Sequence, residues 1–546
     1  MRRAAGVALP FAGYLAFLVV LTWPLGAHVT THLPHVASDF ISDLYYVGWA
    51  LAWQTHALLT DPSQFPNGNI YGGAPLALFY GTPGFGLLPV YAPIFAATGN
   101  PTLALNGTIF VNLAATAAAL HVVVRSWTGS ELAGIAAGTT LMTSKTALIM
   151  DAIMPHYAAI AALPVLMWWL WRSPSGWRAA LGLAALVAFQ CATDVVYVAL
   201  PIVLVFGSVA LARLVRPATR MMGLRMLAAL ALAGVALSPL YAGYLAVRAA
   251  NPALATQSIW RGTFFGWVDD RTGLPLGYGP LALDPWALLP VLAGGIAIVF
   301  GAVALPRERA RAWRHAASWY VVCAMIAWVI PLQYPQFREL VLGSFMRDFL
   351  RLGLPALVAA CLLVGLGFDA CATAVRRLLP SAATPVVVLL CVLVVAGRVG
   401  HARYATGEYP IEPAPTAGVE GPILRVGTGP VLVLPIGDPT KDSGSHATAM
   451  YRSIGVWRPL LNGYCSYYPS NFRARMELAR RLPEPAVLDT LRQETRLTNV
   501  VVNSMGVPQL TIDRWRKEVE AGTLPGVRIE HDDGEVMVLA IDPLGW

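Results

Sequence analysis

Long apolar runs separated by short polar stretches fill most of the chain up to residue 403. A membrane-spanning helix needs about 20 apolar residues, and windows of that length predict about eleven spans. We place these windows near residues 8–28, 102–124, 130–148, 157–171, 178–193, 195–212, 223–242, 284–303, 315–332, 352–370 and 381–399. The segment 84–98 is short and interrupted by prolines, so we interpret it as a re-entrant piece and not as a twelfth span.

The pattern changes after Gly400, where short apolar stretches alternate with amphipathic ones. Residues 431–436, 498–503 and 535–541 read as strands, whereas 471–482 and 510–521 read as helices. The sequence therefore predicts two domains. Residues 1–403 form a transmembrane domain with a long first outer loop, 29–101, and residues 404–546 form an α/β domain large enough for its own core.

Composition supports a mostly α-helical, polytopic membrane protein. Hydrophobic residues make up 56% of the chain and charged residues 12%, which excludes a soluble protein of this length. The N-terminal apolar run is followed by further spans, so we expect an uncleaved anchor. The six cysteines form neither a disulfide framework nor a metal-ligand spacing, so no cofactor is predicted, although a divalent metal ion stays open.

The charges predict how the chain crosses the membrane. With eleven spans, 15 of the 24 basic residues before Tyr404 lie on one face, which the positive-inside rule makes cytoplasmic. Ten of the 13 acidic residues in the same region reach the other face. The tail carries 14 basic and 17 acidic groups and is placed outside the cell. We therefore expect a membrane protein with a cytoplasmic N-terminus, an extracytoplasmic C-terminal domain and no role in nucleic-acid binding.

An acidic residue and an aromatic stripe follow the first span in the stretch SDLYYVGWALAW, residues 42–53. On a helix, Tyr45, Trp49 and Trp53 share one face, as expected for a helix lying in the headgroup layer. Asp43 stands at the mouth of the first span, where a carboxylate can act on a lipid-borne substrate. An ordinary interfacial anchor with a solvated acid is the alternative interpretation.

This first loop resembles that of the GT-C glycosyltransferases, polytopic enzymes that take a sugar from a polyprenyl-phosphate carrier. A nearer resemblance is to uncharacterised bacterial membrane proteins of the same superfamily. The pieces that carry it stand in the expected order: Ser42-Asp43, Trp49-Ala50-Leu51-Ala52-Trp53, Asn69-Ile70-Tyr71 and Gly99-Asn100-Pro101, followed by TGSELAGIAAG (128–138) and YRSIGVWRPLLNGYCSYYPSNF (451–472). The chain departs from the pattern at Leu44, at Val456, and at Gly81-Thr82, where many relatives carry a second carboxylate.

The resemblance implies a reaction that needs few protein groups. A polyprenyl-phosphate sugar has a good leaving group, so one base on the acceptor hydroxyl suffices, and Asp43 is the candidate, with inversion at the anomeric carbon. The donor phosphate needs cations near the outer surface. The candidates are Arg347 and Arg351, four residues apart at the start of the tenth predicted span, and Arg261. Snorkelling of the two arginines to lipid headgroups is the alternative.

Other polar residues fit contacts to the sugar or the acceptor, and each has an equally ordinary structural interpretation. These are Asp151 and His156 near the fourth predicted span, Asp194 in the turn QCATDVVY, and Tyr451, Arg458, Asn462 and Tyr464 in the tail. Capping between spans, a polar loop or an Asn-Gly turn would account for them without a ligand.

The sequence thus predicts a membrane glycosyltransferase that moves a sugar from a lipid-linked donor to a glycan, lipid or protein acceptor at the outer face. One alternative is a non-catalytic scaffold of the same fold in cell-envelope glycan synthesis. Another is a lipid or solute transporter, which would require polar groups at mid-bilayer that the predicted spans hardly offer.

Overall fold

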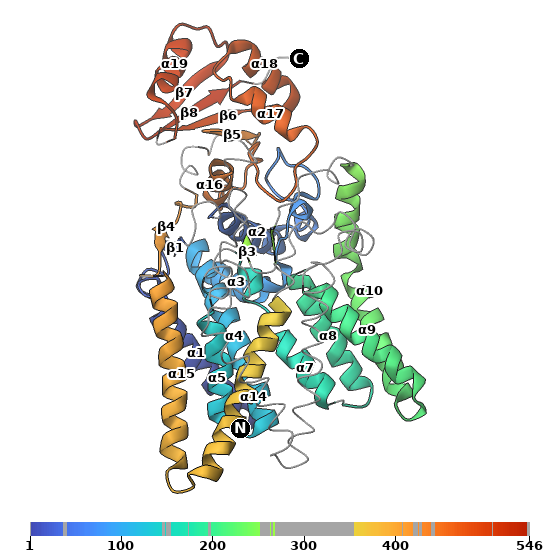
Figure 1. The fold of residues 1–546 in the computed structure, drawn as a ribbon. Coiled ribbons are helices and arrows are strands. Elements are labelled where there is room, and N and C mark those ends of the chain that lie inside the picture. The colour runs from blue at the N-terminus through green and yellow to red at the C-terminus, as the bar shows by residue number, and fades with distance from the viewer. Residues whose placement is uncertain are drawn as a thin grey trace.

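A computed structural model describes residues 2–35, 41–144, 148, 154–172, 174–194, 198–251, 262–263, 266–267, 354–406, 408–418, 424, 428–437, 443–504 and 506–542. The described protein is mostly helical and is arranged in three layers (Figure 1). A helical bundle lies at one end and a four-stranded sheet with its helices at the other. Between them lies a layer built largely from residues 41–98 and the tail segment 443–472.

The bundle helices coincide with nine of the eleven predicted windows. They are α1 (Arg2–Leu21), α4 (Pro101–Thr128), α5 (Glu131–Met142), α7 (Ala162–Arg172), α8 (Trp177–Thr193), α9 (Ala199–Val215), α10 (Arg220–Ala250), α14 (Leu354–Leu378) and α15 (Ala383–Thr406). Windows 284–303 and 315–332 lie outside the described residues, so the total of eleven stays a prediction.

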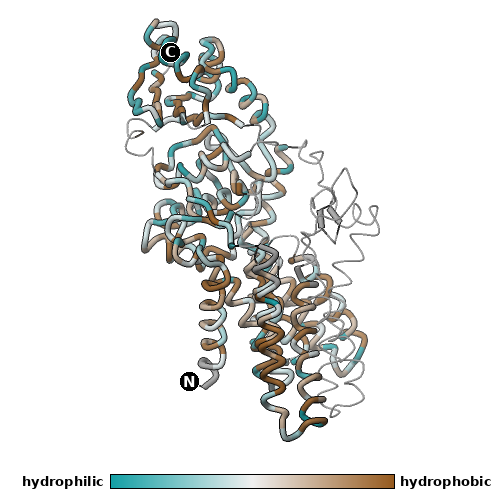
Figure 2. Tube along the Cα trace, turned by 60° about the vertical axis from the view of Figure 1, so that its left-hand side comes forward, coloured by the Kyte–Doolittle hydropathy of each residue, from teal (hydrophilic) through white to brown (hydrophobic). Residues whose placement is uncertain are grey.

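Four of the described helices are long and apolar enough to cross a membrane, and they lie within Pro101–Thr128, Pro217–Ala250, Leu357–Leu378 and Ala383–Gly400. Shorter apolar helices accompany them, and Figure 2 shows hydrophobic residues dominating the bundle while the opposite end is mixed. Length and composition of these helices support a location in a membrane.

Local sequence signals determine where the longest buried bundle helix, α4, begins and ends. Asn100 is its N-cap, and the side-chain oxygen accepts a hydrogen bond from the Leu103 amide at 2.9 Å. Pro101 follows at the first helical position, where a missing N–H costs nothing. Gly129 ends the helix in the left-handed region with φ 75°. The Gly99-Asn100-Pro101 piece of the sequence pattern thus serves as a helix boundary.

The middle layer contains α2 (Ile41–Thr60), the short 3₁₀ turns η3 (Pro62–Gln64), η4 (Ala77–Tyr80) and η5 (Phe85–Leu87), and α3 (Leu88–Thr98). The eleven-residue α3 packs against α2 and α4. A two-stranded antiparallel ribbon, β1 (His32–Pro34) with β4 (Ile411–Pro413), joins the chain leaving α1 to the chain leaving α15. Residues from both ends of the sequence therefore frame this layer.

The C-terminal sheet has strand order β5-β6-β8-β7. Its strands are β5 (Val431–Leu434), β6 (Asn499–Asn503), β7 (Val527–Asp532) and β8 (Val536–Ile541), with β5 and β6 parallel and the other pairs antiparallel. The helices of the tail are α16 (Gly444–Arg452), which packs against α2 in the middle layer, and α17 (Phe472–Ala479), α18 (Pro485–Thr495) and α19 (Gln509–Glu520). The strands β5, β6 and β8 coincide with the three predicted strands, and α17 and α19 with the two predicted helices. The helices α16 and α18 were not predicted, nor was β7, which has alternating burial along an edge of the sheet.

The prediction that the aromatic stripe of α2 lies among lipid headgroups is wrong. Trp49 is fully buried, and Tyr45 and Trp53 are buried nearly as completely. The reason is that the tail covers this face: the ring of Tyr45 lies 5.5 Å from that of Tyr451, and Trp53 meets Trp457 edge to face at 5.6 Å. The stripe is therefore an interface within the protein.

Several basic residues of the bundle lie at one end of the molecule. The N-terminus, the α9–α10 turn and the α14–α15 turn all lie at the end of the bundle away from the C-terminal sheet (Figure 1). These segments carry Arg213, Arg216, Arg220, Arg376 and Arg377, which are five of the 15 basic residues that the predicted spans place on the cytoplasmic face. The described basic turns and the C-terminal sheet therefore lie at opposite ends of the described protein, while the topology in the membrane stays a prediction.

Candidate active site

Asp43 lies in the first turn of α2 and is half-buried. The hydroxyl of Tyr464, which comes from the tail segment after α16, donates a hydrogen bond of 2.6 Å to its Oδ1 atom. Burial, and next the negative charge of Asp43, hold the pKa of Tyr464 well above its usual range, so this phenol keeps its proton and acts as a donor. A half-buried carboxylate thus accepts a hydrogen bond from a half-buried phenol.

Among the described neighbours of this pair are hydroxyl and thiol groups. Ser443 donates to the hydroxyl of Ser42, the residue before Asp43, at 3.0 Å. Tyr46, one turn along α2, meets the Tyr464 ring edge to face at 6.5 Å. Burial raises the pKa of the Cys465 thiol to about 12, and the charge of Asp43 adds to the shift. The thiol is therefore protonated and not a nucleophile at neutral pH.

The tail reaches Asp43 because it pairs with the first loop. The Leu460 amide donates to the carbonyl of Asn69 at 2.5 Å, and the Tyr71 amide donates to the carbonyl of Asn462 at 3.1 Å. At Gly463 a Cβ atom would overlap the Tyr71 ring, so this close approach requires glycine. The Asn-Ile-Tyr and Asn-Gly-Tyr pieces of the sequence are thus two sides of one docking contact.

The same contact extends to the aromatic stripe of α2. The indole of Trp49 donates to the side-chain oxygen of Asn69 at 2.8 Å, and the Asn69 amide donates to the Arg458 carbonyl at 3.0 Å. Trp49 and Asn69 therefore hold the first loop, α2 and the tail together. This network fixes the position of α2, and with it the position of Asp43.

Where a second acid is absent from the sequence, at Gly81-Thr82, the structure packs tightly around Gly81. A Cβ atom at Gly81 would lie 2.5 Å from the hydroxyl of Tyr46, and the Gly81 carbonyl accepts a hydrogen bond from Tyr244 at 2.9 Å. A carboxylate at position 81 would therefore require Tyr46 to move. Within the described residues, no group of three or more His, Cys, Asp or Glu side chains is placed to hold a metal ion.

Three predicted substrate contacts of the tail take part in bonds within the protein. Tyr451 is fully buried, and its hydroxyl lies 2.9 Å from that of Thr102. Asn462 bonds both the amide and the carbonyl of Val433 at 2.8 Å. Arg458 makes five hydrogen bonds inside the C-terminal region. Of the four predicted tail residues, Tyr464 is the one that contacts Asp43.

The remaining predicted residues lie elsewhere or outside the described part. His156 is buried in the 3₁₀ turn η7 (Pro155–Tyr157), and Asp194 is buried at the C-terminal end of α8. The structure does not describe Asp151, Arg261, Arg347 or Arg351. Their roles therefore stay predictions.

The sequence analysis missed several residues that tie the layers together. Asn251, at the end of α10, donates to the hydroxyl of Tyr80 at 2.9 Å and accepts from the Ser470 amide at 3.2 Å. Glu412 of β4 accepts a hydrogen bond of 2.6 Å from Tyr45. Arg398, buried in α15, donates to the hydroxyl of Thr143 at 3.1 Å. The apolar window around Arg398 gave no signal for it, since one charge hardly changes mean hydropathy.

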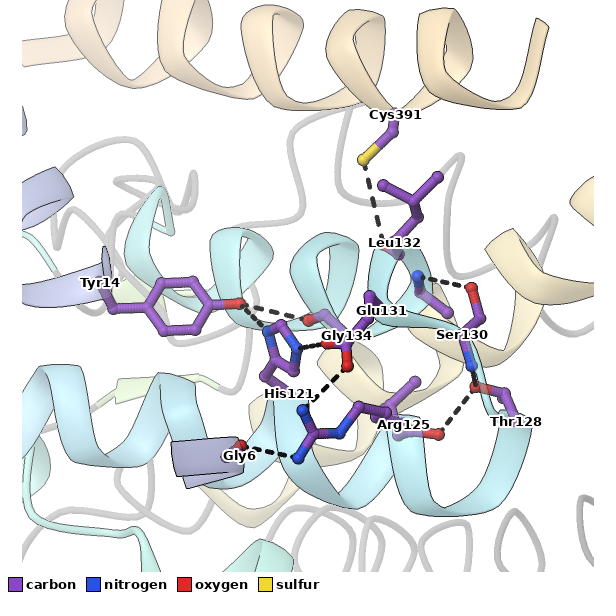
Figure 3. Close-up of polar contacts among 12 residues, drawn as sticks. Gly6, Tyr14, His121, Arg125, Thr128, Ser130, Glu131, Leu132, Gly134 and Cys391 are labelled. Carbon is purple, nitrogen blue, oxygen red and sulfur yellow. Dashed lines mark hydrogen bonds and ion pairs between the residues drawn. The ribbon is translucent and has the colours of Figure 1, made fainter. Parts of the chain in front are cut away.

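A second polar network lies between α1, α4 and α5, within the bundle (Figure 3). His121 is buried, with Nδ1 3.0 Å from the Tyr14 hydroxyl and Nε2 2.9 Å from the carboxylate of Glu131. Arg125 donates to the same carboxylate at 2.9 Å and to the Gly6 carbonyl at 2.7 Å. Their hydrogen bonds connect α1, α4 and α5, so we interpret the network as one that stabilises the packing of the bundle.

We expect Gly134→Ala to loosen this network. A Cβ atom at Gly134 would lie 2.8 Å from the backbone carbonyl of His121, so α4 and α5 would have to separate. Overpacking of this kind costs about 1–3 kcal/mol, and thermal melting in detergent should occur at a lower temperature. Gly182→Ala in α8 is the matched control, because its Cβ would meet nothing within 4 Å. Equal melting of the two variants would contradict the tight packing.

Comparisons with known proteins find similarity at the level of structure. No family model matches the chain, and no curated protein gives a match. Among solved structures, the chain is similar to the crystal structure of ArnT from Cupriavidus metallidurans in the apo state, with 14% identity and a TM-score of 0.47. The alignment covers 99% of this chain and 98% of that one.

Proposed function

We propose that this protein is a membrane glycosyltransferase that moves a sugar from a polyprenyl-phosphate donor to an acceptor hydroxyl at the outer face of a bacterial inner membrane. The observation that carries the proposal is the position of Asp43. It is a half-buried carboxylate in the layer between an apolar bundle and the tail, held by Tyr464 at 2.6 Å. The resemblance of the first loop to GT-C glycosyltransferases supports the same assignment.

In this reaction Asp43 acts as the general base. Its carboxylate takes the proton of the acceptor hydroxyl while the acceptor oxygen forms a bond to the anomeric carbon. The bond from that carbon to the phosphate oxygen breaks, and polyprenyl phosphate leaves with the electron pair. Attack from the opposite side inverts the configuration. A carboxylate has about four lone-pair sites, so it can accept from Tyr464 and from the substrate together.

The proposed topology places this chemistry outside the cytoplasm. The basic turns of the bundle lie at the end opposite the C-terminal sheet, and the positive-inside rule would make that end cytoplasmic. The layer that holds Asp43 then lies at the outer end of the bundle, where the headgroups of a lipid-linked donor are found. Arg261, Arg347 and Arg351 stay proposed partners of the donor phosphate.

Transfer measured with the full-length protein in lipid vesicles tests the proposal. Donors with a common polyprenyl phosphate and different sugars are supplied with membrane extracts of acceptor glycans and lipids. We expect donor-dependent labelling of an acceptor together with release of polyprenyl phosphate. Donor binding without release of polyprenyl phosphate, whichever acceptor is supplied, would favour the non-catalytic scaffold. Movement of the intact donor across the bilayer, again without release of polyprenyl phosphate, would favour a transporter.

A further inference from the structure

We infer that Tyr464 is a positioning residue for the base, so that the tail takes part in setting the pH range in which Asp43 can accept a proton. This inference rests on the proposed function and deepens it. The phenol belongs to a segment 421 residues away from Asp43 in the sequence. The experiment that tests this inference does not require a transfer reaction.

The geometry is that of a strong, charge-assisted hydrogen bond. The Tyr464 hydroxyl lies 2.6 Å from Oδ1 of Asp43, which is within the range for an O–H donor to a carboxylate. Such a bond stabilises the ionised acid more than the neutral one. It also restricts rotation of the carboxylate about its last torsion angle. The first effect keeps Asp43 ionised to lower pH, although it makes the carboxylate a weaker base. The second effect holds the carboxylate in one orientation toward a substrate hydroxyl.

The position of the phenol is determined by the docking contact of the tail. Gly463, immediately before Tyr464, packs on the Tyr71 ring, and the backbone amide of Tyr464 donates to the sulfur of Met450 in α16 at 3.1 Å. The phenol ring also contacts the ring of Tyr46 of α2 edge to face. Three separate contacts therefore direct one hydroxyl to the acid, which would not be needed for a side chain that merely fills space.

Two other tyrosines allow this role to be separated from packing. Tyr91 of α3 is fully buried and also bonds to α2, but its hydroxyl donates to the backbone carbonyl of Gly48 at 3.3 Å. Tyr71 is likewise buried, and its hydroxyl donates to the carbonyl of Tyr467 at 3.2 Å. Tyr91→Phe therefore removes a tyrosine hydroxyl that contacts the same helix, α2, without touching the acid.

The experiment follows the infrared band of the protonated carboxyl of Asp43, which is identified by its loss in Asp43→Asn. In Tyr464→Phe we expect the midpoint of this band to move to higher pH by about one unit or more, since a donor to the charged form is lost. In Tyr91→Phe it should stay unchanged. Replacing Tyr464 by 3,5-difluorotyrosine, a better donor of nearly the same shape, should move the midpoint to lower pH.

Where transfer is found, the acid limb of its pH profile should move by the same amounts. An unchanged midpoint in folded Tyr464→Phe and in the difluorotyrosine protein would overturn the inference while leaving the function of Asp43 intact. Conversely, a shifted midpoint in a protein without transfer would uphold the positioning role and reject the enzymatic proposal. If Tyr464→Phe fails to fold, the difluorotyrosine protein still decides between these outcomes.

Discussion

Asp43→Asn should lower transfer by about 10²-fold or more, because general-base catalysis contributes about 10²- to 10⁴-fold and an amide cannot take the proton. The fold should survive, since the amide oxygen of Asn can still accept the hydrogen bond from Tyr464. Binding of the lipid-linked donor should change little, because the base contacts the acceptor. The measurement is transfer in vesicles, with donor binding determined separately on the same preparation.

Asp61→Asn is the matched control for this loss. Asp61 follows α2 in the same layer, but its carboxylate is exposed and caps the turn η3, where it accepts hydrogen bonds from the Ser63 amide and hydroxyl. Asn is an equally good cap, so the variant should keep full transfer. Undiminished transfer in Asp43→Asn would reject the mechanism. Equal losses in both variants would instead indicate a general effect of charge in this layer.

The sequence was sufficient for the elements whose causes are local. Apolar windows located the bundle helices, because about 20 apolar residues suffice to define a span wherever it packs. The Asn100 and Gly129 caps likewise act within one turn of α4. The tail strands followed from short β-branched runs such as the Asn499–Asn503 stretch of β6, which is buried on both faces.

What the sequence could not reveal depends on contacts between distant segments. The stripe of Tyr45, Trp49 and Trp53 indicated one apolar face of α2, but periodicity does not say whether lipid or protein covers that face. The tail covers it, and the pair Asp43 and Tyr464 arises from the same docking. Both residues were predicted for the site, yet no local signal joined them.

The tail arginine Arg458 illustrates the same difficulty. Its residue type and its neighbourhood suggested a sugar contact, whereas the structure places its guanidinium among carbonyl and side-chain oxygens of the C-terminal region. It donates to Gly429 and Leu424 carbonyls at 2.8–3.2 Å, and further to Thr498 at 2.7 Å and Asn499 at 2.8 Å. Residue type alone cannot distinguish an arginine that contacts a ligand from one whose hydrogen bonds lie within the protein.

We therefore expect Arg458→Ala to destabilise the protein strongly. Truncation removes five hydrogen bonds to a charged group and leaves the buried oxygens it served without that donor, at a cost of about 3 kcal/mol or more. The contacts join the segment before β5 to the start of β6, so the C-terminal sheet should lose its fixed packing first. Thermal melting in detergent, together with proteolysis of the tail, measures the loss.

Arg481→Ala provides the comparison, because Arg481 is exposed and pairs with Glu484 at the surface, where an ion pair contributes little. That variant should melt with the wild type. An Arg458→Ala protein that melts with the wild type but binds the lipid-linked donor or the acceptor more weakly would reverse the assignment. Its guanidinium would then serve the substrate, and the five bonds inside the C-terminal region would be a resting arrangement that substrate replaces.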